Sequence, residues 1–303
     1  MKYNQTILFS GASGFLGNNI LTQLELEYDK VTTIGRNKNN NIVVDLTTSI
    51  PDLKERYDIV LHAAGKAHIV PKTAEEEKAF YDVNVEGTKN LCRALEISGQ
   101  PKSFIFISSV AVYGCESGEL IDESHPLNGS SPYALSKIEA ERFLQEWCAK
   151  NGIILTILRP SLLAGINPPG NLGAMINGIK KGFYFNIGKG EVKKSVLMAE
   201  DIANLIPLVK DKGGVYNICD TEQPSFGELS RLIASQLGKG IPLSIPLWLA
   251  KAMAKIGDLA GRKAPINSYR LAKLTDSLTF SNQKAVSELG WTPLKVLDNL
   301  NIS

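Results

Sequence analysis

Residues 7–17, ILFSGASGFLG, decide the fold of this chain. An apolar strand stops at three glycines, Gly11, Gly14 and Gly17, and an amphipathic stretch follows at residues 18–27. A glycine permits positive φ, a second lets a ligand approach the backbone, and a third lets the helix pack on the strand. The free N–H groups at the start of such a helix suit a phosphate, so we predict a dinucleotide turn that includes Ser13, Phe15 and Leu16. A plain glycine-rich loop is the alternative, because the spacing is one residue longer than the usual fingerprint.

The end of the second strand indicates which dinucleotide is bound. About 20 residues beyond the glycines, the fingerprint predicts the residue that handles the adenosine ribose. Gly35 and Arg36 stand there. An acidic side chain would bind a free 2′-hydroxyl, whereas Arg36 suits a 2′-phosphate, so NADP(H) is favoured and NAD(H) is the alternative. The other interpretation of Arg36 is a solvated arginine at a strand end.

Composition excludes several classes of function. The chain has 303 residues, 44% of them hydrophobic, and its 33 basic and 31 acidic residues nearly cancel, so we expect no nucleic-acid partner. The four cysteines show no C-x-x-C pairing and the three histidines form no cluster, so we expect reduced thiols, a cytoplasmic location and no metal. Neither a signal peptide nor a run of about 18 apolar residues is present, so we expect a soluble protein with no membrane partner.

The order of apolar and amphipathic segments predicts an α/β fold. Short apolar strands alternate with helical stretches such as residues 75–99 and 131–152, which is typical of a Rossmann-like, doubly wound parallel sheet. We assign residues 1–165 to this NAD(P)-binding domain and residues 166–303 to a smaller C-terminal α+β substrate domain, with segments near 195–220 returning to the sheet. The helix expected near residues 245–261 has two interpretations. A membrane-surface or partner helix is one, and the short length and few cations favour a core or interface helix.

Three residues form a candidate catalytic group. Tyr133 and Lys137 are four apart on a predicted helix and therefore project from one face. A nearby ammonium lowers the pKa of a phenol and makes it a better acid or base at neutral pH. Ser109 follows an apolar strand at the carboxyl edge of the sheet, where its hydroxyl can hold a substrate oxygen. A Y-x-x-x-K pair on the surface is the alternative.

The chain resembles the extended short-chain dehydrogenase/reductases of the nucleotide-sugar epimerase/dehydratase family. The family motifs appear in order as GASGFLG (11–17), HAAG (62–65), NVEGT (84–88), SSVAVYG (108–114), YALSK (133–137), LRPS (158–161) and LGWTP (289–293). The resemblance implies that Tyr133 is the acid/base, that Lys137 is its partner and also reaches the nicotinamide ribose, and that Ser109 donates to the substrate oxygen. It also implies cofactor contacts, listed here as Asp45 with Leu46 at the adenine and Ala63, Ala64 and Gly65 at the ribose and phosphates.

Departures from the family pattern narrow the expected reaction. Val110 and Ala111 stand where sugar 4,6-dehydratases carry acidic residues, which disfavours dehydration. Ser161 and Leu162 replace an asparagine found in many 4-epimerases. We therefore expect NADP(H)-dependent reduction at carbon 4 of a UDP-sugar, with a 4-keto-6-deoxy hexose as substrate and a 2-acetamido hexose of that kind as a variant. A UDP-hexose 4-epimerase with tightly bound NAD is the main alternative, and a silent dinucleotide-binding regulator is a third.

The substrate and partner residues are expected from the same resemblance. Lys194, with Lys193 beside it, occupies the position where a cation meets the nucleotide diphosphate, and Arg270 is a second candidate. Asn171 and His68 are placed near the sugar, whereas His62 is expected to be structural. Solvated surface charge is the alternative for the cations. The family pairing of two long helices predicts a homodimer, with apolar surface listed as Phe80, Leu91, Phe143, Leu144 and Trp147.

Overall fold

Seven parallel strands form the central sheet of the computed structural model, which describes residues 2–67, 70–260 and 267–302. The strands are β1 (Tyr3–Ser10), β2 (Tyr28–Gly35), β3 (Ile42–Val43), β4 (Ile59–His62), β5 (Ser103–Ile107), β7 (Ile154–Pro160) and β11 (Gly214–Ile218). Their order is β11-β7-β5-β4-β1-β2-β3, and every neighbouring pair is parallel. The chain order reverses between β1 and β4, the position where open α/β sheets bind ligands.

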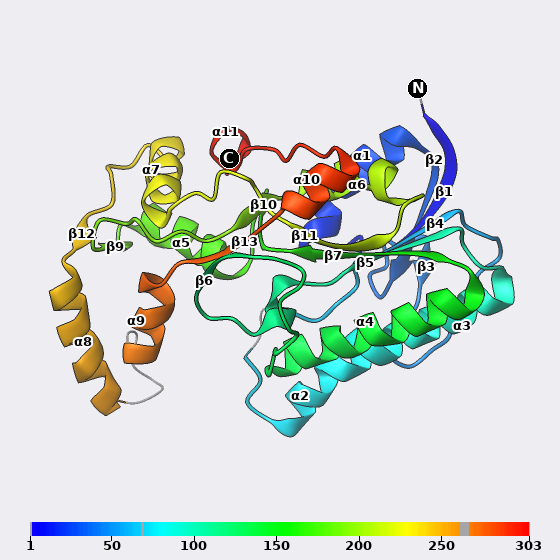
Figure 1. Ribbon diagram of the computed structural model, residues 1–303, viewed down its shortest axis with the longest axis horizontal. Helices are drawn as coiled ribbons and strands as arrows, with labels where there is room; N and C mark the ends of the chain where they lie inside the picture. Colours follow the sequence, from blue (N-terminus) through cyan, green and yellow to red (C-terminus); the bar gives the residue numbers. More distant parts are fainter. Residues whose placement is uncertain (1, 68–69, 261–266, 303) are drawn as a thin grey trace.

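Helices cover both faces of this sheet (Figure 1). On one face lie α1 (Phe15–Glu27) and α6 (Glu200–Val209), and on the other lie α3 (Gly87–Ser98) and α4 (Pro132–Asn151). Strand alternation explains the two layers, since Ile7 and Phe9 of β1 join the first core cluster and Leu8 joins the second. The predicted doubly wound, Rossmann-like sheet is confirmed.

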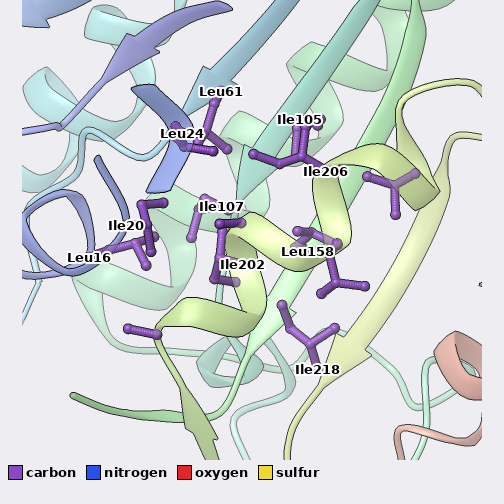
Figure 2. Close-up of a cluster of buried hydrophobic side chains, with 14 of the residues drawn as sticks. Leu16, Ile20, Leu24, Leu61, Ile105, Ile107, Leu158, Ile202, Ile206 and Ile218 are labelled. Carbon is purple, nitrogen blue, oxygen red and sulfur yellow. The ribbon is translucent and has the colours of Figure 1, made fainter. Parts of the chain in front are cut away.

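Figure 2 shows the core cluster under α1 and α6, where aliphatic side chains of both helices meet those of the strands. Ile20 and Leu24 project from α1 one turn apart, and Ile202 and Ile206 do the same from α6. These four side chains are fully buried. Burying one such side chain stabilises a fold by roughly 1.5–3 kcal/mol, so this layer fixes α1 and hence the glycine turn that precedes it.

The helix expected at residues 75–99 is interrupted. The structure has α2 (Ala74–Tyr81), a π-helical segment η1 (Asp82–Glu86) and then α3. The π segment adds a residue to the turn and re-aims the side chains that follow. Asn84 lies inside it and is buried, and such π segments occur frequently at functional sites.

The C-terminal half adds a second layer of shorter elements and returns twice to the large sheet. Its strand pairs, all parallel, are β8 (Leu162–Ala164) with β10 (Val196–Met198), β9 (Asn186–Ile187) with β12 (Ser244–Ile245), and β13 (Leu278–Phe280) with β6 (Gly118–Ile121). Its remaining helices are α5 (Gly170–Lys181), α7 (Phe226–Gln236), α8 (Leu247–Ala260), α9 (Ser268–Thr275), α10 (Gln283–Leu289) and α11 (Val296–Asn299). Residues 195–220 contribute α6 and β11 to the large sheet.

Two sequence-based expectations about apolar surfaces are wrong in detail. Four of the five residues expected to cover a dimer interface, Phe80, Leu91, Leu144 and Trp147, are buried within the chain itself, and only Phe143 is partly exposed. The homodimer therefore stays a prediction without that surface. The segment expected as a core or interface helix, α8, exposes its large apolar side chains, so it is not a core helix of this chain, and the interface alternative stays a prediction. Within the described ranges no helix combines the length and apolar character needed to span a bilayer.

The C-terminal segment is held to the sheet layer by a buried carboxylate. Asp201 of α6 is fully buried and accepts hydrogen bonds from the backbone N–H of Leu294 at 3.2 and 3.1 Å. Burial raises the pKa of Asp201 from 3.8 to about 7, and the hydrogen bond from Leu294 only partly offsets this. The folded protein thus binds a proton at Asp201 more tightly than the unfolded chain does.

This raised pKa predicts the pH dependence of stability. A group that binds its proton more tightly when folded stabilises the fold at low pH, and this contribution is lost as the pH rises from 3.8 toward about 7. Asp201→Asn cannot ionise and should flatten the profile of unfolding free energy against pH in that window. Urea titrations at several pH values measure the effect, with Asp211→Asn, an exposed carboxylate, as control. Equal slopes for Asp201→Asn and the wild type would contradict the assignment.

Candidate active site

The glycine turn joins β1 to α1 and lies against the end of β4. Gly11 has φ +84°, and a Cβ there would stand 2.6 Å from the carbonyl carbon of Ala63 and from the nitrogen of Ala64. Gly17 is equally restricted, because its Cβ would lie 2.2 Å from the carbonyl oxygen of Ala12. The N-cap residue of α1 is Gly14, which has no side chain to cap the first-turn N–H groups. The predicted strand–turn–helix is therefore present, with Ser13 exposed and Phe15 and Leu16 in the first turn of α1.

A buried hydrogen-bond relay connects the turn to the π segment. Ser10 Oγ lies 2.5 Å from His62 Nδ1 and accepts from the N–H of Ala64 at 3.3 Å. His62 Nε2 lies 2.8 Å from Thr88 Oγ1, which donates to the carbonyl oxygen of Asn84 at 2.7 Å. Because Thr88 uses its own proton on Asn84, it accepts from His62 Nε2–H, and Nδ1 accepts from Ser10. Burial lowers the pKa of His62 to about 3, so the ring is neutral and structural, as expected from the sequence.

Asn84 links this relay to the candidate catalytic helix. Its Oδ1 accepts from the N–H of Lys66 at 2.8 Å, and its Nδ2 donates to Ser136 Oγ at 2.8 Å. Ser136 in turn donates to the carbonyl oxygen of Tyr133 at 2.8 Å. Sequence reasoning placed Asn84 in a family motif but gave it no role, because the π segment that turns it inward is not visible in the pattern.

Lys137 is almost completely buried, and its ammonium is held by three groups. Nζ donates to the carbonyl oxygen of Ile107 at 2.8 Å and lies 4.6 Å from the centroid of the Phe106 ring. Burial lowers the pKa of Lys137 to about 8, and the charge of Glu141, one turn further along α4, opposes that shift. A Cβ on Gly65 would stand 3.2 Å from this Nζ, so Gly65 borders the ammonium, as expected of a cofactor-lining residue.

Tyr133 and Ser109 form the other half of the candidate catalytic group. Ser109 caps η2 (Val110–Tyr113), a short 3-10 helix after β5, by accepting from the N–H of Ala111 at 3.1 Å. Burial raises the pKa of Tyr133, and a side-chain hydrogen bond with Ser109 acts in the opposite direction. Burial is the larger of these two effects, so the pKa of Tyr133 lies above its usual value, and the lowering of that pKa by Lys137 stays a prediction. Tyr133 holds its proton at neutral pH and is arranged as an acid.

A buried ion pair that the sequence analysis missed stands directly behind this group. Arg159 donates to both carboxylate oxygens of Glu141, from Nε at 3.1 Å and from Nη2 at 2.6 Å, and the two side chains are 5% and 1% exposed. Ser108 also donates to Glu141, and Arg159 Nη1 donates to the hydroxyl of Tyr113 at 3.0 Å. In the sequence, Arg159 stands within an apolar run and Glu141 follows Lys137 by four residues. Neither feature by itself predicts that the two side chains pair.

Arg36 and Asp45 face one another at the edge where the adenosine is expected. Arg36 is exposed just beyond β2, as the sequence predicts. Burial raises the pKa of Asp45, but hydrogen bonds from Thr47 and the charge of Arg36 outweigh it, so the pKa lies below its usual value. The Asp45 carboxylate accepts from the N–H and hydroxyl of Thr47 at 3.0 and 2.7 Å, and Leu46 is buried beside Gly87. The cation of Arg36 therefore interacts electrostatically with the carboxylate of Asp45 at this edge of the sheet.

Of the predicted substrate residues, Lys194 and its neighbour Lys193 lie on the side of the sheet that carries Ser109. Lys193 and Lys194 lie in an extended segment, and a β-bridge joins Lys194 to Leu278 at the start of β13. Phe280 of the same strand stacks on Tyr113 at 5.8 Å, which brings this segment to the side of the sheet that carries Ser109. Lys193 is exposed and Lys194 half-buried.

The other predicted substrate residues are less informative. Asn171 is exposed in the first turn of α5. Arg270 belongs to α9, and its side chain, like the whole of His68, lies outside the described residues.

Comparisons with known proteins agree with this geometry. Residues 7–219 match the sequence model of the NAD dependent epimerase/dehydratase family. The chain is 30% identical over 304 residues to the N-acetyl-alpha-D-glucosaminyl-diphospho-ditrans,octacis-undecaprenol 4-epimerase of Escherichia coli O157:H7, covering 94% of this chain and 89% of that one. It is 28% identical over 250 residues to a GDP-6-deoxy-D-mannose reductase of Pseudomonas aeruginosa, covering 76% and 79%.

A solved structure shows the same fold. The UDP-glucose 4-epimerase of Thermotoga maritima, crystallised with UDP-glucose, superposes with a TM-score of 0.72 at 21% identity, over 98% of this chain and 96% of that one.

Proposed function

We infer the function of this chain from its family and its site: it belongs to the NAD dependent epimerase/dehydratase family and is an enzyme of NAD(P)-dependent nucleotide-sugar chemistry. We propose that it reduces the carbon-4 ketone of a UDP-sugar. The observation that supports this most strongly is the grouping of Ser109, Tyr133 and Lys137 at the carboxyl edge of the sheet. No acidic residue stands at Val110 or Ala111, which leaves proton transfer at oxygen as the chemistry of the site.

The residues of the glycine turn fit a dinucleotide. A pyrophosphate would lie against the uncapped start of α1, next to the turn that Gly11 lets pack against the backbone of Ala63 and Ala64. Ala63, Ala64 and Gly65 would line its other side, and Lys137 Nζ, next to Gly65, would donate to the nicotinamide ribose. When bound, the nicotinamide supplies the hydride chemistry.

The chain's own residues position the sugar and move the proton. The Ser109 hydroxyl would hold the carbon-4 oxygen, and the Tyr133 phenol would give its proton to that oxygen as the ketone is reduced. The raised pKa of Tyr133 favours this acid role. The buried ammonium of Lys137 would stabilise the phenolate that remains once Tyr133 has lost its proton, and Asn84 and Ser136 fix the backbone of the turn that carries Tyr133.

A 4-epimerase is the second candidate function. One observation favours the reductase, and another favours the 4-epimerase. Arg36, exposed at the end of β2, suits a 2′-phosphate and therefore an exchangeable NADPH, which supports a reductase. The relative matched over 94% of this chain is a 4-epimerase, which supports reversible oxidation and reduction without net redox change. The two are distinguished by incubating the protein with NADPH and a UDP-4-keto-6-deoxy sugar, and separately with UDP-glucose or UDP-GlcNAc without added cofactor. Stoichiometric loss of NADPH supports the reductase, and interconversion of epimers supports the alternative.

Tyr133→Phe tests the proton donor. The variant keeps the ring and loses the hydroxyl, so turnover should fall by about 10²–10⁴-fold while the affinity for dinucleotide is unchanged. Steady-state kinetics and fluorescence titration measure the two quantities. Tyr3→Phe, at the exposed start of β1, is the matched control and should behave as the wild type. Near-normal turnover of Tyr133→Phe would rule out the mechanism.

Arg36→Ala tests the cofactor. Loss of a charge-assisted hydrogen bond to a 2′-phosphate should weaken NADPH binding by about 1.5–3 kcal/mol and leave NADH binding nearly unchanged. Because Asp45 then loses its neighbouring cation, NADPH should suffer further from repulsion. Calorimetric titration with both dinucleotides measures the difference. An equal effect on NADPH and NADH, or none on either, would contradict the role of Arg36.

Lys194→Ala tests the diphosphate carrier. The KM for a UDP-sugar should rise by about 10–100-fold, since a charge-assisted contact to a phosphate oxygen is lost. Lys193→Ala, adjacent but exposed, should have a smaller effect and controls for general loss of charge. Free UDP should inhibit competitively. Absence of inhibition at millimolar UDP would contradict a UDP-linked substrate. If Lys194→Ala still impaired turnover in that case, the substrate would be a sugar diphosphate linked to a group other than a nucleoside, as in the name of the undecaprenol-linked relative.

A further inference from the structure

The two faces of α8 are reversed relative to an ordinary surface helix. Its buried face consists of small residues spaced four and three apart, namely Ala250, Ala254 and Gly257. Its outer face carries large apolar side chains, of which Trp248 is 71%, Ile256 70% and Leu259 90% exposed. A surface helix normally turns its large apolar residues to the core. The small residues of α8 therefore pack inside the protein, and its large apolar residues are left available for a contact outside it.

The orientation of α8 is fixed by contacts on its buried face and near its C-terminal end. Ala250 and Ala254 pack with Leu271 of α9 in a separate small core cluster. The carboxylate of Asp258 accepts from the N–H and from the hydroxyl of Ser268, at 2.9 and 2.6 Å, where α9 begins. A rotation of α8 that buried Trp248 would break both contacts. The exposed row is therefore the outer face of a docked helix.

The strands β9 and β12 lie at the same end of the molecule as α8 (Figure 1). The pairing of β12 with β9 brings the segment before α8 next to the segment after α5, and the N–H of Asn186 donates to the carbonyl oxygen of Leu243 at 2.9 Å. Exposed apolar residues flank these two strands. We call the whole set the α8 surface: Trp248, Leu249, Met253, Ile256, Leu259, Ile241, Leu243, Phe183 and Phe185.

Positive charge is concentrated around this surface. Residues 176–190 and 239–260 together contain six lysines and one aspartate, whereas the net charge of the whole chain is only +2. Lys251 and Lys255 are exposed, and they follow Trp248 and precede Leu259 by three and four residues, so they border the apolar row on α8. Lys181 Nζ lies 6.0 Å from the centroid of the Phe183 ring. The one aspartate, Asp258, is engaged by Ser268.

We propose that the α8 surface docks on the surface of an anionic lipid bilayer, with α8 lying in the plane of the headgroups. An apolar face bordered by lysines is the pattern of interfacial helices, whose apolar side chains enter the acyl boundary while the cations meet anionic headgroups. An exposed tryptophan suits this depth, because its ring is apolar and its N–H is polar. This docking is independent of the proposed reaction and revises the expectation of no membrane partner. It requires no helix that crosses the bilayer.

The chain contains its own probe for this contact. Of its three tryptophans, Trp147 and Trp291 are 8% and 2% exposed, so a change in emission on adding vesicles reports Trp248. Vesicles of equal parts phosphatidylglycerol and phosphatidylcholine should shift the emission to shorter wavelength and co-sediment the protein. Vesicles of phosphatidylcholine alone should bind far less, and added salt should weaken binding to the anionic ones. Trp248→Phe should still co-sediment and lose the spectral shift.

Paired variants separate the apolar and the charged contributions. The double variant Trp248→Ser with Ile256→Ser, and the double variant Lys251→Glu with Lys255→Glu, should each lower partition onto anionic vesicles by about 10–100-fold. Leu26→Ser, a 69% exposed leucine of α1, and Lys150→Glu, at the end of α4, are the matched controls and should bind as the wild type. Unchanged thermal unfolding of all variants establishes that they fold.

Two results would overturn the proposal. The first is equal, weak binding to anionic and neutral vesicles by the wild type. The second combines two observations. The emission of Trp248 is already at short wavelength without vesicles and moves to longer wavelength on dilution. The protein also has a mass above that of one chain, and the Trp248→Ser, Ile256→Ser double variant has the mass of one chain. That second result would show that another copy of the chain covers the surface. Because neither measurement uses substrate, both are independent of the proposed reaction.

Discussion

A single buried ammonium, that of Lys137, organises the candidate active site. Removing the charge of Lys137 from water is unfavourable unless it is paired, and the structure supplies the carbonyl oxygen of Ile107, the face of the Phe106 ring and the nearby carboxylate of Glu141. These partners come from β5 and from the next turn of α4, so satisfying the ammonium fixes α4 against the end of β5. Tyr133, one turn earlier on the same helix, is then placed beside Ser109, which follows that strand.

The Glu141–Arg159 pair extends this arrangement across the sheet. Glu141 cannot be buried alone, and Arg159 on β7 gives it two hydrogen bonds while also donating to Tyr113. Tyr113 then donates to Asn217 of β11 at 2.7 Å. The polar network therefore joins α4, η2, β7 and β11 behind the catalytic residues. Removing one partner from such a buried pair typically costs about 3–5 kcal/mol, so the network makes the position of α4 depend on strands far away in the sequence.

The two ends of the molecule differ in whether their large apolar side chains are buried. Around the large sheet, the aliphatic side chains that α1 and α6 turn toward the strands are buried (Figure 2). At the end that carries α8 and α9 (Figure 1), the buried cluster consists of Ala250, Ala254 and Leu271, whereas the large apolar side chains of α8 are exposed, as are Lys251 and Lys255.

The sequence by itself determined the sheet and the glycine turn, because both depend on local spacing: apolar runs of strand length and glycines three apart. The same kind of spacing, Tyr133 and Lys137 four apart on one helix, predicted the candidate catalytic group. Only the tertiary structure decided four other features. The π segment that turns Asn84 inward looks like ordinary helix in the pattern, and Glu141 meets Arg159 only because α4 packs over β7. The pKa of Tyr133 is raised although a lysine lies one turn away, since burial depends on everything packed around the phenol. The outward face of α8 belongs with these, because apolar periodicity identifies a helix face and its neighbours decide whether that face is inside.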